Sequence, residues 1–323
     1  MKKAMIFGID GQDGSYLADL LLSKDYQVIG WVPEAIPVSY ENINHIIDEI
    51  EIVEGSLIDQ EGVNSLLRNY LPEEVYNLAS PSSPPASWEN VVYKSDVVAL
   101  GVARLLEAIR TNIPSSRFYQ ASSSELFGDP LEEPQNENTP FHPRNPYGIS
   151  KLFAHWLTVN YRNKYDLFTV SGIMYNHESP RRGLQYVTRK ITNSAAKIKL
   201  GLSDKLRLGN LEARRDWGYA GDYVKAMWLM LQQDHPIDYV IGTGKTHSVR
   251  EFCDLAFSHL GLDYREHITV DDAYFRPNEN KRLVADCKKA NNELNWQPET
   301  SFKELVKTMV DEDYRSLKSL SKD

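Results

Sequence analysis

The chain has 323 residues, of which 41% are hydrophobic, so it is long enough for about two packed domains. Its formal net charge of −9 argues against a broad surface for a phosphate backbone, and so against nucleic acid as a partner. Two cysteines, Cys253 and Cys287, are too few for a disulfide framework and fit a reducing, cytoplasmic location. Neither a signal peptide nor a membrane-spanning segment is expected, because every apolar run is too short.

The first predicted elements are a short apolar strand, a glycine-rich turn and a helix. Residues 4–7 form the strand, and residues 16–22 have helical spacing. The turn between them reads Gly8-Ile9-Asp10-Gly11-Gln12-Asp13-Gly14. Glycines at this place let the backbone approach a pyrophosphate, which binds at the helix N-terminus. The turn therefore predicts dinucleotide binding, with Asp13 expected to cap the helix.

A second strand over residues 27–32 runs into Pro33 and Glu34. Dinucleotide-binding folds often place an acid near this point, where it accepts hydrogen bonds from ribose hydroxyls. Glu34 fits that role, and it fits equally well the role of a solvated loop acid. No arginine directly follows the strand to pair with a 2′-phosphate.

Further apolar strands alternate with helices along the chain. An amphipathic helix is predicted over residues 97–113, and the strands over 51–54, 75–78, 117–121 and 168–174. Apolar strands that alternate with helices are typical of a parallel sheet covered on both faces. The predicted fold class is α/β, with a doubly wound parallel sheet.

The segment that carries most chemistry contains Ser123, Glu125, Tyr147 and Lys151. Tyr147 and Lys151 are four residues apart, so on a helix they share a face. A nearby ammonium favours phenolate, so the pKa of Tyr147 is expected to fall from about 10 toward neutral. Ser123 would hold a substrate alcohol beside this phenolate. Glu125 adds the second base that loss of water next to a new ketone requires.

The character of the chain changes after residue 175. Segments 178–218 and 268–282 are rich in Arg, Asn, Asp and Pro, while 223–231 is predicted as a helix, 239–242 as a strand and 301–320 as a helix. This pattern predicts a smaller second domain that is discontinuous in sequence. The predicted division is a dinucleotide-binding domain and a substrate domain, made of 1–175 with about 219–245 and of about 176–218 with 246–323.

With these motifs placed, the chain resembles the extended short-chain dehydrogenases/reductases and, more closely, the GDP-mannose 4,6-dehydratase family. The resemblance covers nearly the whole chain. It rests on Gly11-Gln12-Asp13-Gly14-Ser15-Tyr16-Leu17, Phe118-Tyr119-Gln120-Ala121-Ser122, Ser124-Glu125-Leu126, Asn176-His177-Glu178-Ser179-Pro180-Arg181-Arg182-Gly183, Val187-Thr188-Arg189-Lys190-Ile191, Leu208-Gly209-Asn210-Leu211, Arg215-Asp216-Trp217-Gly218 and Tyr274-Phe275-Arg276-Pro277. It implies a Rossmann-type sheet with a smaller, discontinuous α/β domain for the sugar nucleotide.

The motifs and the resemblance together predict three groups of site residues and no metal site. The catalytic group is Ser123, Glu125, Tyr147 and Lys151. The cofactor group is Gly8, Gly11, Gln12, Asp13, Gly14, Glu34, Ser56, Leu57, Leu78, Ser80, Ser82, Tyr93, Tyr147, Lys151, His177 and Arg182. The substrate group is Ser82, Ser123, Glu125, Asn176, Lys190, Arg215, Arg276 and Glu279.

The activity that the resemblance implies is that of an NAD(P)-dependent hydro-lyase, which converts GDP-mannose or a close GDP-sugar to GDP-4-keto-6-deoxy-mannose. Tyr147 takes the C4 hydroxyl proton as hydride leaves C4. Glu125 removes the C5 proton and helps expel the C6 hydroxyl as water, and hydride returns to C6. The alternatives are a GDP-manno-heptose 4,6-dehydratase, a 4-keto reductase or 4-epimerase of the same fold, and a non-catalytic dinucleotide-binding sensor. Glu125 argues against the reductase and the epimerase.

The chain departs from the family pattern beside the expected cofactor. Pro33 and Glu34 stand where the family usually has two Arg that bind the NADP phosphate, so NAD is favoured although NADP is the family norm. Ser56 replaces a usual Asp, and Ser123 a usual Thr. The stretch Ser80-Pro81-Ser82-Ser83-Pro84 replaces a usual Ala-Gln-Ser-His-Val.

Assembly is expected to follow the family in part. Extended members commonly pair through two long helices into a four-helix bundle, which here would be residues 97–113 and 147–165. The family tetramer uses the loop after the second strand, and this loop is altered here. A homodimer is therefore predicted, with a tetramer as the alternative.

Overall fold

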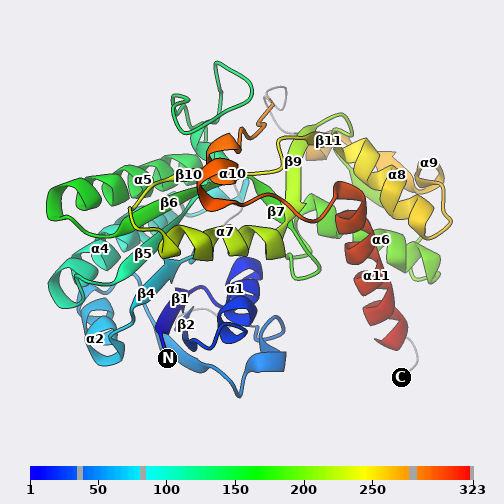
Figure 1. The fold of residues 1–323 in the computed structure, drawn as a ribbon. Coiled ribbons are helices and arrows are strands. Elements are labelled where there is room, and N and C mark those ends of the chain that lie inside the picture. The colour runs from blue at the N-terminus through cyan, green and yellow to red at the C-terminus, as the bar shows by residue number, and fades with distance from the viewer. Residues whose placement is uncertain (35–38, 81–84, 276–281, 321–323) are drawn as a thin grey trace.

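The computed structural model describes residues 1–34, 39–80, 85–275 and 282–320. Two lobes lie side by side, a larger one built on a parallel sheet and a smaller one that includes the C-terminal helix (Figure 1). Among the described residues, no helix combines the length and the apolar character that crossing a membrane requires.

The larger lobe contains seven parallel strands in the order β10-β6-β5-β4-β1-β2-β3. They are β1 (Lys3–Phe7), β2 (Gln27–Pro33), β3 (Glu51–Gly55), β4 (Glu74–Asn77), β5 (Arg117–Ser123), β6 (Thr169–Met174) and β10 (Tyr239–Ile241). Met5 of β1 lies opposite Ile29 of β2 and Val75 of β4. The strand order reverses between β1 and β4, which is where such sheets bind ligands, at the carboxyl ends of the strands. The predicted doubly wound parallel sheet is confirmed.

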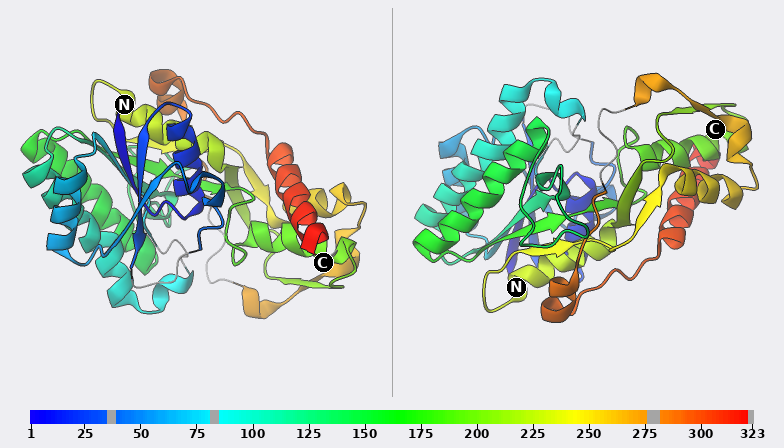
Figure 2. Two further views of the ribbon diagram at one scale, coloured as in Figure 1. Left: turned by 90° about the horizontal axis from the view of Figure 1, so that it is seen from below. Right: turned by 90° about the horizontal axis from the view of Figure 1, so that it is seen from above.

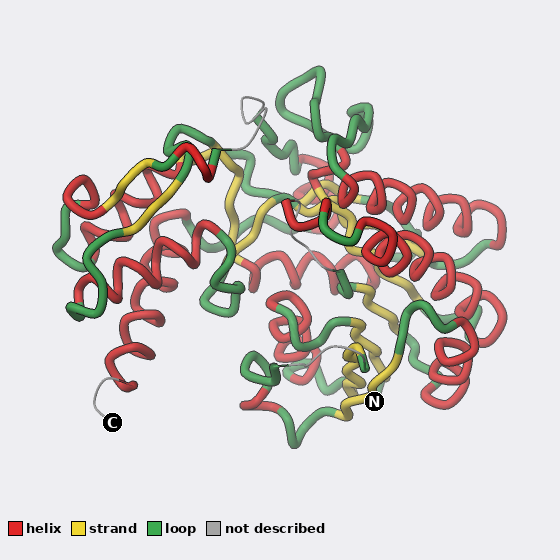
Figure 3. The backbone as a smooth tube through the Cα atoms, turned by 180° about the vertical axis from the view of Figure 1, so that it is seen from behind, coloured by secondary structure: helices red, strands yellow, loops and turns green. Residues whose placement is uncertain are grey.

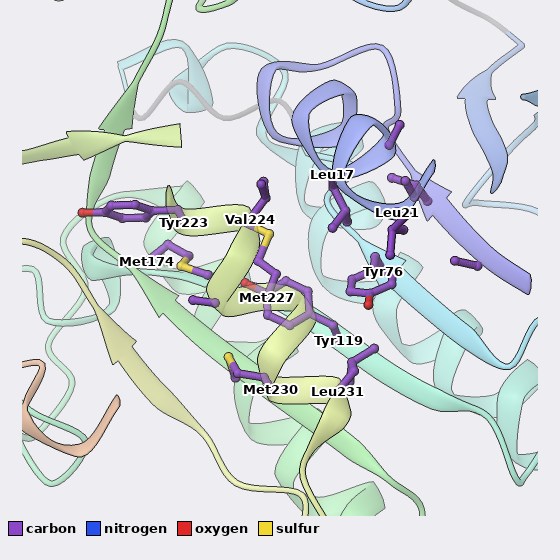
Figure 4. Packing of buried hydrophobic residues seen from close by; sticks show 14 of the residues in the cluster. Leu17, Leu21, Tyr76, Tyr119, Met174, Tyr223, Val224, Met227, Met230 and Leu231 are labelled. Atoms are coloured by element: carbon purple, nitrogen blue, oxygen red, sulfur yellow. The ribbon is translucent and has the colours of Figure 1, made fainter. Parts of the chain in front are cut away.

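Helices cover both faces of this sheet (Figure 3). On one face lie α1 (Gln12–Leu22) and α7 (Ala220–Gln232), and on the other α2 (Gln60–Tyr70), α4 (Gly101–Asn112) and α5 (Pro146–Tyr165). Figure 4 shows the packing on the face covered by α1 and α7, where Leu17, Leu21 and Met227 lie around the strand residues Tyr76 and Tyr119. Because both faces are covered, the strands are apolar on both sides, which explains their continuous apolar runs.

The helix predicted over residues 97–113 has a more complex form. The helical segment begins earlier than predicted, at Val91. It is composed of α3 (Val91–Ser95), a π-helical turn (Asp96–Leu100) and α4, which follow one another without a break. Gly101 lies at the junction, where an added Cβ would be 3.2 Å from the Leu57 Cβ. The glycine thus lets α4 pack close to the segment that follows β3.

Among the described residues, the smaller lobe has two short sheets and four α-helices. Its elements are β7 (Asn176–Glu178), α6 (Val187–Lys199), β8 (Leu206–Leu208), β9 (Arg214–Tyr219), β11 (Thr246–Ser248), α8 (Val249–His259), α9 (Tyr264–His267), β12 (Ile268–Val270) and α11 (Phe302–Leu320). Its core includes Ile191, Trp217, Phe252 and Met309, all nearly or fully buried. Figure 2 shows α11 in red within this lobe, where it packs on α6 and α8.

The chain passes between the lobes several times. It leaves the sheet at β7, returns with α7, leaves again at β11 and returns with α10 (Lys288–Leu294) before α11. Leu294 and Trp296 pack in the core of the larger lobe, and the Trp296 indole donates to the Asp222 carbonyl at 2.8 Å. The predicted residue ranges of the two domains stay a proposal. We add to that proposal that the chain returns to the larger lobe near α10.

Candidate active site

A cavity lies where the carboxyl ends of β1, β4, β5 and β6 meet the smaller lobe. Its lining brings together the glycine turn, the end of β5, the start of α5, β7, α6 and β9. The predicted residues that line it are Gly8, Gly11, Gln12, Asp13, Gly14, Leu78, Ser80, Ser123, Glu125, Tyr147, Lys151, Asn176, His177, Arg182, Lys190 and Arg215. All four predicted catalytic side chains are therefore in one cavity with the glycine turn.

The start of α5 positions the carboxylate of Glu125, which is predicted to be catalytic. Asn145 is the N-cap of the helix, and its side-chain oxygen accepts a hydrogen bond from the Gly148 amide at 2.8 Å. The amide nitrogen of the same side chain donates to Glu125 Oε2, also at 2.8 Å. An added Cβ at Gly148 would be 2.8 Å from the Glu125 carbonyl oxygen, so glycine allows this close approach. Sequence reasoning missed Asn145, although Asn followed by Pro is a helix-start signal.

Ser123, Tyr147 and Lys151 form the other part of the catalytic group. Ser123 is the last residue of β5, and its hydroxyl accepts a hydrogen bond from the Glu125 amide at 3.2 Å and is hydrogen-bonded to Tyr147. Lys151 is buried on the same helix as Tyr147, with its ammonium 5.8 Å from the centroid of the Tyr147 ring. That ammonium donates to the Ala121 carbonyl at 2.7 Å.

The electrostatics of Tyr147 differ from the prediction. Burial raises the pKa of Tyr147, the hydrogen bond with Ser123 lowers it, and the negative charge of Glu125 raises it further. The expectation that Lys151 brings this pKa below 10 is wrong for this structure, because burial dominates and the ammonium lies beside the ring. Burial also disfavours the charged form of Lys151 and lowers its pKa to about 8, while the negative charge of Asp13 opposes this lowering.

The glycine turn has the shape that a bound phosphate group requires. Gly8 has a φ of +84°, and an added Cβ there would lie 3.0 Å from Ala79 Cα. At Gly14 an added Cβ would lie 2.2 Å from the Gly8 carbonyl oxygen, so no larger residue fits. Helix α1 begins beside the cavity, and its N-cap residue Gly11 makes no side-chain cap.

Asp13 does not cap α1, contrary to the sequence-based expectation. Its carboxylate is bound instead by His177 Nε2 at 2.8 Å and by the Gln12 amide at 3.0 Å. The physical reason is that β7 brings His177 against the turn, and an imidazole is a stronger partner than the helix's own amides.

A dinucleotide fits the donors of this end of the cavity. The first amides of α1 point along the helix axis toward it, where the helix dipole favours an anion. Ser80 adds a hydroxyl oxygen that is buried and has no hydrogen-bond partner among the described residues. Such an orphaned group beside an open glycine turn is the kind of donor that a diphosphate or ribose satisfies.

Some predicted cofactor residues lie outside the cavity lining. Glu34 is exposed after the end of β2, where its amide donates to the Gly55 carbonyl at 3.1 Å. Ser56 and Leu57 follow β3, with Leu57 buried in the core, and Tyr93 lies on α3. Their roles stay predictions. Ser82, Arg276 and Glu279 lie outside the described residues.

The smaller lobe contributes cations and aromatic rings to the cavity. The Lys190 ammonium lies 4.2 Å from the centroid of the Tyr274 ring, and burial lowers the pKa of Lys190. The Arg182 guanidinium lies 3.6 Å from the centroid of the Tyr186 ring and 3.3 Å from the Glu178 carboxylate. These cations suit a negatively charged ligand.

Sequence reasoning did not assign several residues of the cavity lining. They include Tyr186, Asn210, Trp217 and Tyr274. The last three are within segments that carry the family resemblance, and this was the available signal. Tyr186 precedes α6 directly, and it is brought to the cavity by the turn that follows Arg182.

Comparison with known proteins agrees with the fold and with the family resemblance. A family model described as GDP-mannose 4,6 dehydratase matches residues 5–309. The chain is 49% identical over 324 residues to GDP-mannose 4,6 dehydratase 1 of Arabidopsis thaliana, with 97% of this chain and 90% of the relative covered. It is 46% identical over 343 residues to the GDP-mannose 4,6 dehydratase of Homo sapiens, with 98% and 92% covered.

Solved structures share the fold at lower identity. A UDP-glucose 4-epimerase of Thermotoga maritima, solved with UDP-glucose, has a TM-score of 0.87 at 24% identity and covers 98% of this chain and 99% of its own. A UDP-glucose 4-epimerase of Thermus thermophilus, in complex with NAD, has a TM-score of 0.83 at 26% identity and covers 96% and 98%.

The fold, with the predicted catalytic residues in one cavity, fits the class of the extended short-chain dehydrogenases/reductases. The match of the family model and the high identity over nearly the whole chain then place it within that class. The chain belongs to the GDP-mannose 4,6-dehydratase family, and the resemblance stated from its motifs is confirmed.

Proposed function

We propose that this chain is a GDP-mannose 4,6-dehydratase, a hydro-lyase that forms GDP-4-keto-6-deoxy-mannose. The observation that carries the proposal is the placement of Glu125. Its carboxylate is fixed by Asn145 at 2.8 Å and lines the same cavity as Ser123 and Tyr147. Oxidation of an alcohol needs only a group that takes its proton, whereas elimination of water beside the new ketone needs a second base at the neighbouring carbon.

The proton movements are assigned to three side chains. Ser123 orients the C4 hydroxyl toward Tyr147, whose oxygen takes the hydroxyl proton. Loss of this proton together with the hydride on C4 gives a C4 ketone. The ketone acidifies the C5 proton, which Glu125 removes before it donates a proton to the departing C6 hydroxyl. The Ser123 hydroxyl, hydrogen-bonded to Tyr147, stabilises the phenolate form against the effect of burial.

A nicotinamide dinucleotide would supply the hydride acceptor at C4 and the hydride donor at C6. The residues that would hold it are those of the glycine turn, Ser80 and Lys151. Lys151 is buried and keeps its ammonium beside Tyr147, where it suits ribose hydroxyls as acceptors.

For the choice of dinucleotide we propose NAD over NADP. Pro33 has no donor to offer, and the exposed carboxylate of Glu34 follows the end of β2. A carboxylate near a 2′-phosphate adds a like-charge repulsion of about 1–4 kcal/mol, depending on exposure. Chromatography of the nucleotide released from the purified protein tests this. Recovery of NADP alone would mean that another cation takes the place of the missing Arg pair.

The GDP part of the substrate is assigned to the smaller lobe. Lys190 and Arg215 line the cavity opposite the catalytic group, and Asn176 of β7 lies between the two lobes. Two cations beside the reacting sugar suit a nucleoside diphosphate. A heptose analogue, GDP-manno-heptose, shares this diphosphate, so parallel turnover of both sugars decides between them.

A homodimer is proposed from an apolar surface on α3, the π-helical turn and α5. Ile149, Phe153 and Trp156 are exposed at helical spacing on α5. Val92 of α3 and Leu100 of the π-helical turn are exposed on the neighbouring helix. Pairing of these helices with a second copy would bury them in a four-helix bundle. Light scattering at micromolar concentration should give a dimer, and a monomer would refute the pairing.

A cytoplasmic location is proposed from the cysteines. Both are free thiols, and burial raises the pKa of Cys253 to about 12, as expected of inert thiols in a reducing compartment.

The proposed activity is tested by mass spectrometry of GDP-mannose incubated with purified protein. We expect a product lighter by one water, formed without added cofactor because hydride is returned in each cycle. Glu125→Gln provides the matched control, in which the mass should stay that of GDP-mannose. Turnover to an isomer of unchanged mass would instead support a 4-epimerase.

A further inference from the structure

His177 lies between two hydrogen-bond acceptors. Its Nε2 is 2.8 Å from the Asp13 carboxylate, and its Nδ1 is 2.7 Å from the Tyr175 carbonyl oxygen. A carbonyl oxygen and a carboxylate can only accept hydrogen bonds, so each ring nitrogen must donate. Both nitrogens can donate only in the protonated imidazolium form. The geometry therefore assigns a positive charge to His177.

The surroundings of the ring agree with this charge. Burial alone would lower the pKa of His177, but the Asp13 carboxylate and the Tyr175 carbonyl raise it above its ordinary value. The pKa of Asp13 falls to about 2 because of His177 and Gln12, against the effect of burial. The other titratable or charged groups near the pair are Arg182 after β7, Lys151 on α5, Tyr119 on β5 and Tyr223 on α7, whose ring centroid lies 4.6 Å from that of His177.

The pair accounts for an acid in a turn that binds anions. Asp13 lies in the first turn of α1, beside the amides expected to hold a diphosphate, and an unpaired carboxylate there would repel that group. Among the described residues, Lys151 donates to the Ala121 carbonyl and Arg182 pairs with Glu178. The hydrogen-bonded cation of Asp13 is thus His177.

We propose that His177 is the resident counter-charge of Asp13, so that Asp13 adds no net negative charge beside the diphosphate of a dinucleotide. His177 then acts through Asp13 as a positioning residue, in place of the direct cofactor contact that the family resemblance implies. The inference rests on the proposed dinucleotide binding.

The same pair fastens the two lobes at the cofactor end. Gln12 bridges the turn to β7, because its amide nitrogen donates to Asp13 at 3.0 Å and to the His177 carbonyl at 3.1 Å. Ser179 completes the bridge by donating to the Gln12 side-chain oxygen at 2.8 Å. An acid in the turn therefore serves to hold β7, and the imidazolium cancels the charge that this acid introduces.

A charge cycle tests the proposal. The four proteins are wild type, His177→Gln, Asp13→Asn and the double variant, and affinity for NAD⁺ and NADP⁺ is measured by calorimetry on full-length protein freed of nucleotide. Glutamine can still donate to Asp13 but has no charge. His177→Gln should bind about 10- to 100-fold more weakly, since it leaves one uncompensated carboxylate beside the diphosphate.

The double variant decides between counter-charge and direct contact. A counter-charge role predicts that Asp13→Asn restores most of the affinity lost in His177→Gln, and that Asp13→Asn alone binds at least as tightly as wild type. A direct contact predicts that the double variant stays as weak as His177→Gln. Absence of dinucleotide binding in wild type would also overturn the proposal.

Nitrogen NMR of the imidazole gives a second readout that needs neither ligand nor turnover. At about pH 7.5, above the ordinary pKa near 6.5, both His177 ring nitrogens should be protonated in wild type and only one in Asp13→Asn. Comparison with His177→Gln assigns the signal, and a neutral ring in wild type would overturn the proposal even if that variant fails to fold. Failure to dehydrate GDP-mannose, with the charge cycle intact, would instead refute only the proposed reaction.

Discussion

The two ends of the cleft are built in different ways. At the reaction end, Ser123, Glu125 and Lys151 are held by hydrogen bonds to the chain itself, on or beside β5 and α5. Glu34, which is predicted to recognise the far end of the cofactor, is exposed after β2 and does not line the cavity. Regular elements thus hold the predicted catalytic residues, while the residue predicted to recognise the outer part of the cofactor lies in a loop. Variants of the predicted catalytic residues should affect turnover strongly, and variants of Glu34 should change the preference between NAD and NADP.

The largest effect is expected from Tyr147→Phe. Without the phenol no group takes the C4 hydroxyl proton, so turnover should fall to background. Stopped-flow absorbance should show no transient reduced nicotinamide, while the melting temperature stays near that of wild type. Substantial turnover in this variant would mean that Ser123 or another group is the base, and the two ends of the cleft would then not differ as described.

Glu125→Gln should reduce dehydration by roughly 10²–10⁴, the usual range for a positioned acid/base. Glutamine keeps the shape, so nucleotide content should not change, and exchange of solvent deuterium into C5 should fall in parallel. Glu133→Gln, at an exposed carboxylate in the loop before α5, is the matched control and should have little effect. Near-normal turnover in Glu125→Gln would remove this carboxylate from the mechanism.

Lys151→Met should change the pH dependence. Burial raises the pKa of Tyr147, and an ammonium 5.8 Å from the ring centroid opposes that rise without overcoming it. Removing the ammonium should therefore raise the apparent pKa of the base further and move the rising limb of the kcat/KM profile to higher pH. Wild type should also lose this help above about pH 8, where Lys151 itself loses its proton. A rising limb at the same pH in both proteins would show that another group sets it.

Two variants of Asn145 distinguish its role as the N-cap of α5 from its role in placing the Glu125 carboxylate. Asn145→Ala should cost about 1 kcal/mol of stability as a lost N-cap and also lower turnover. Asn145→Asp keeps a capping oxygen but replaces the donor to Glu125 with a like charge, so stability should recover while turnover stays low. Thermal unfolding and steady-state rates measure the two effects, and full recovery of turnover in Asn145→Asp would contradict the positioning role.

The smallest effect is expected at Glu34, beside the predicted site of the far end of the cofactor. Glu34→Arg exchanges a repulsive carboxylate for a cation that can pair with a 2′-phosphate. The ratio of affinities for NADP and NAD should shift by about tenfold or more toward NADP, with maximal turnover little changed. An unchanged ratio would place Glu34 away from the cofactor and would leave it as a solvated loop acid.

The sequence predicted the sheet well for a physical reason. Strands buried on both faces are continuous apolar runs, and the segments predicted as strands include β1, β2, β5 and β6. The meeting of the four predicted catalytic residues in one cavity could also be expected from the sequence, because Tyr147 and Lys151 share one helix and Ser123 and Glu125 lie at the end of one strand. The π-helical turn was not predicted, since its apolar spacing hardly differs from that of the flanking helix.

Long-range contacts were beyond the sequence. Asp13 and His177 are 164 residues apart, and only the folded chain brings β7 against the glycine turn. The pKa of Tyr147 was predicted in the wrong direction for a similar reason. The spacing of Tyr147 and Lys151 gave their shared face, but neither the burial of the phenol nor the bond from Lys151 to Ala121 could be deduced from it.

The central claim is that hydride leaves C4 and returns to C6 of the same sugar, with Glu125 eliminating water between the two steps. The direct test is turnover of GDP-mannose labelled with deuterium at C4, followed by NMR of the product. We predict deuterium in the new methyl group at C6 and none at C4. Deuterium retained at C4, or lost to solvent or to added cofactor, would contradict this account.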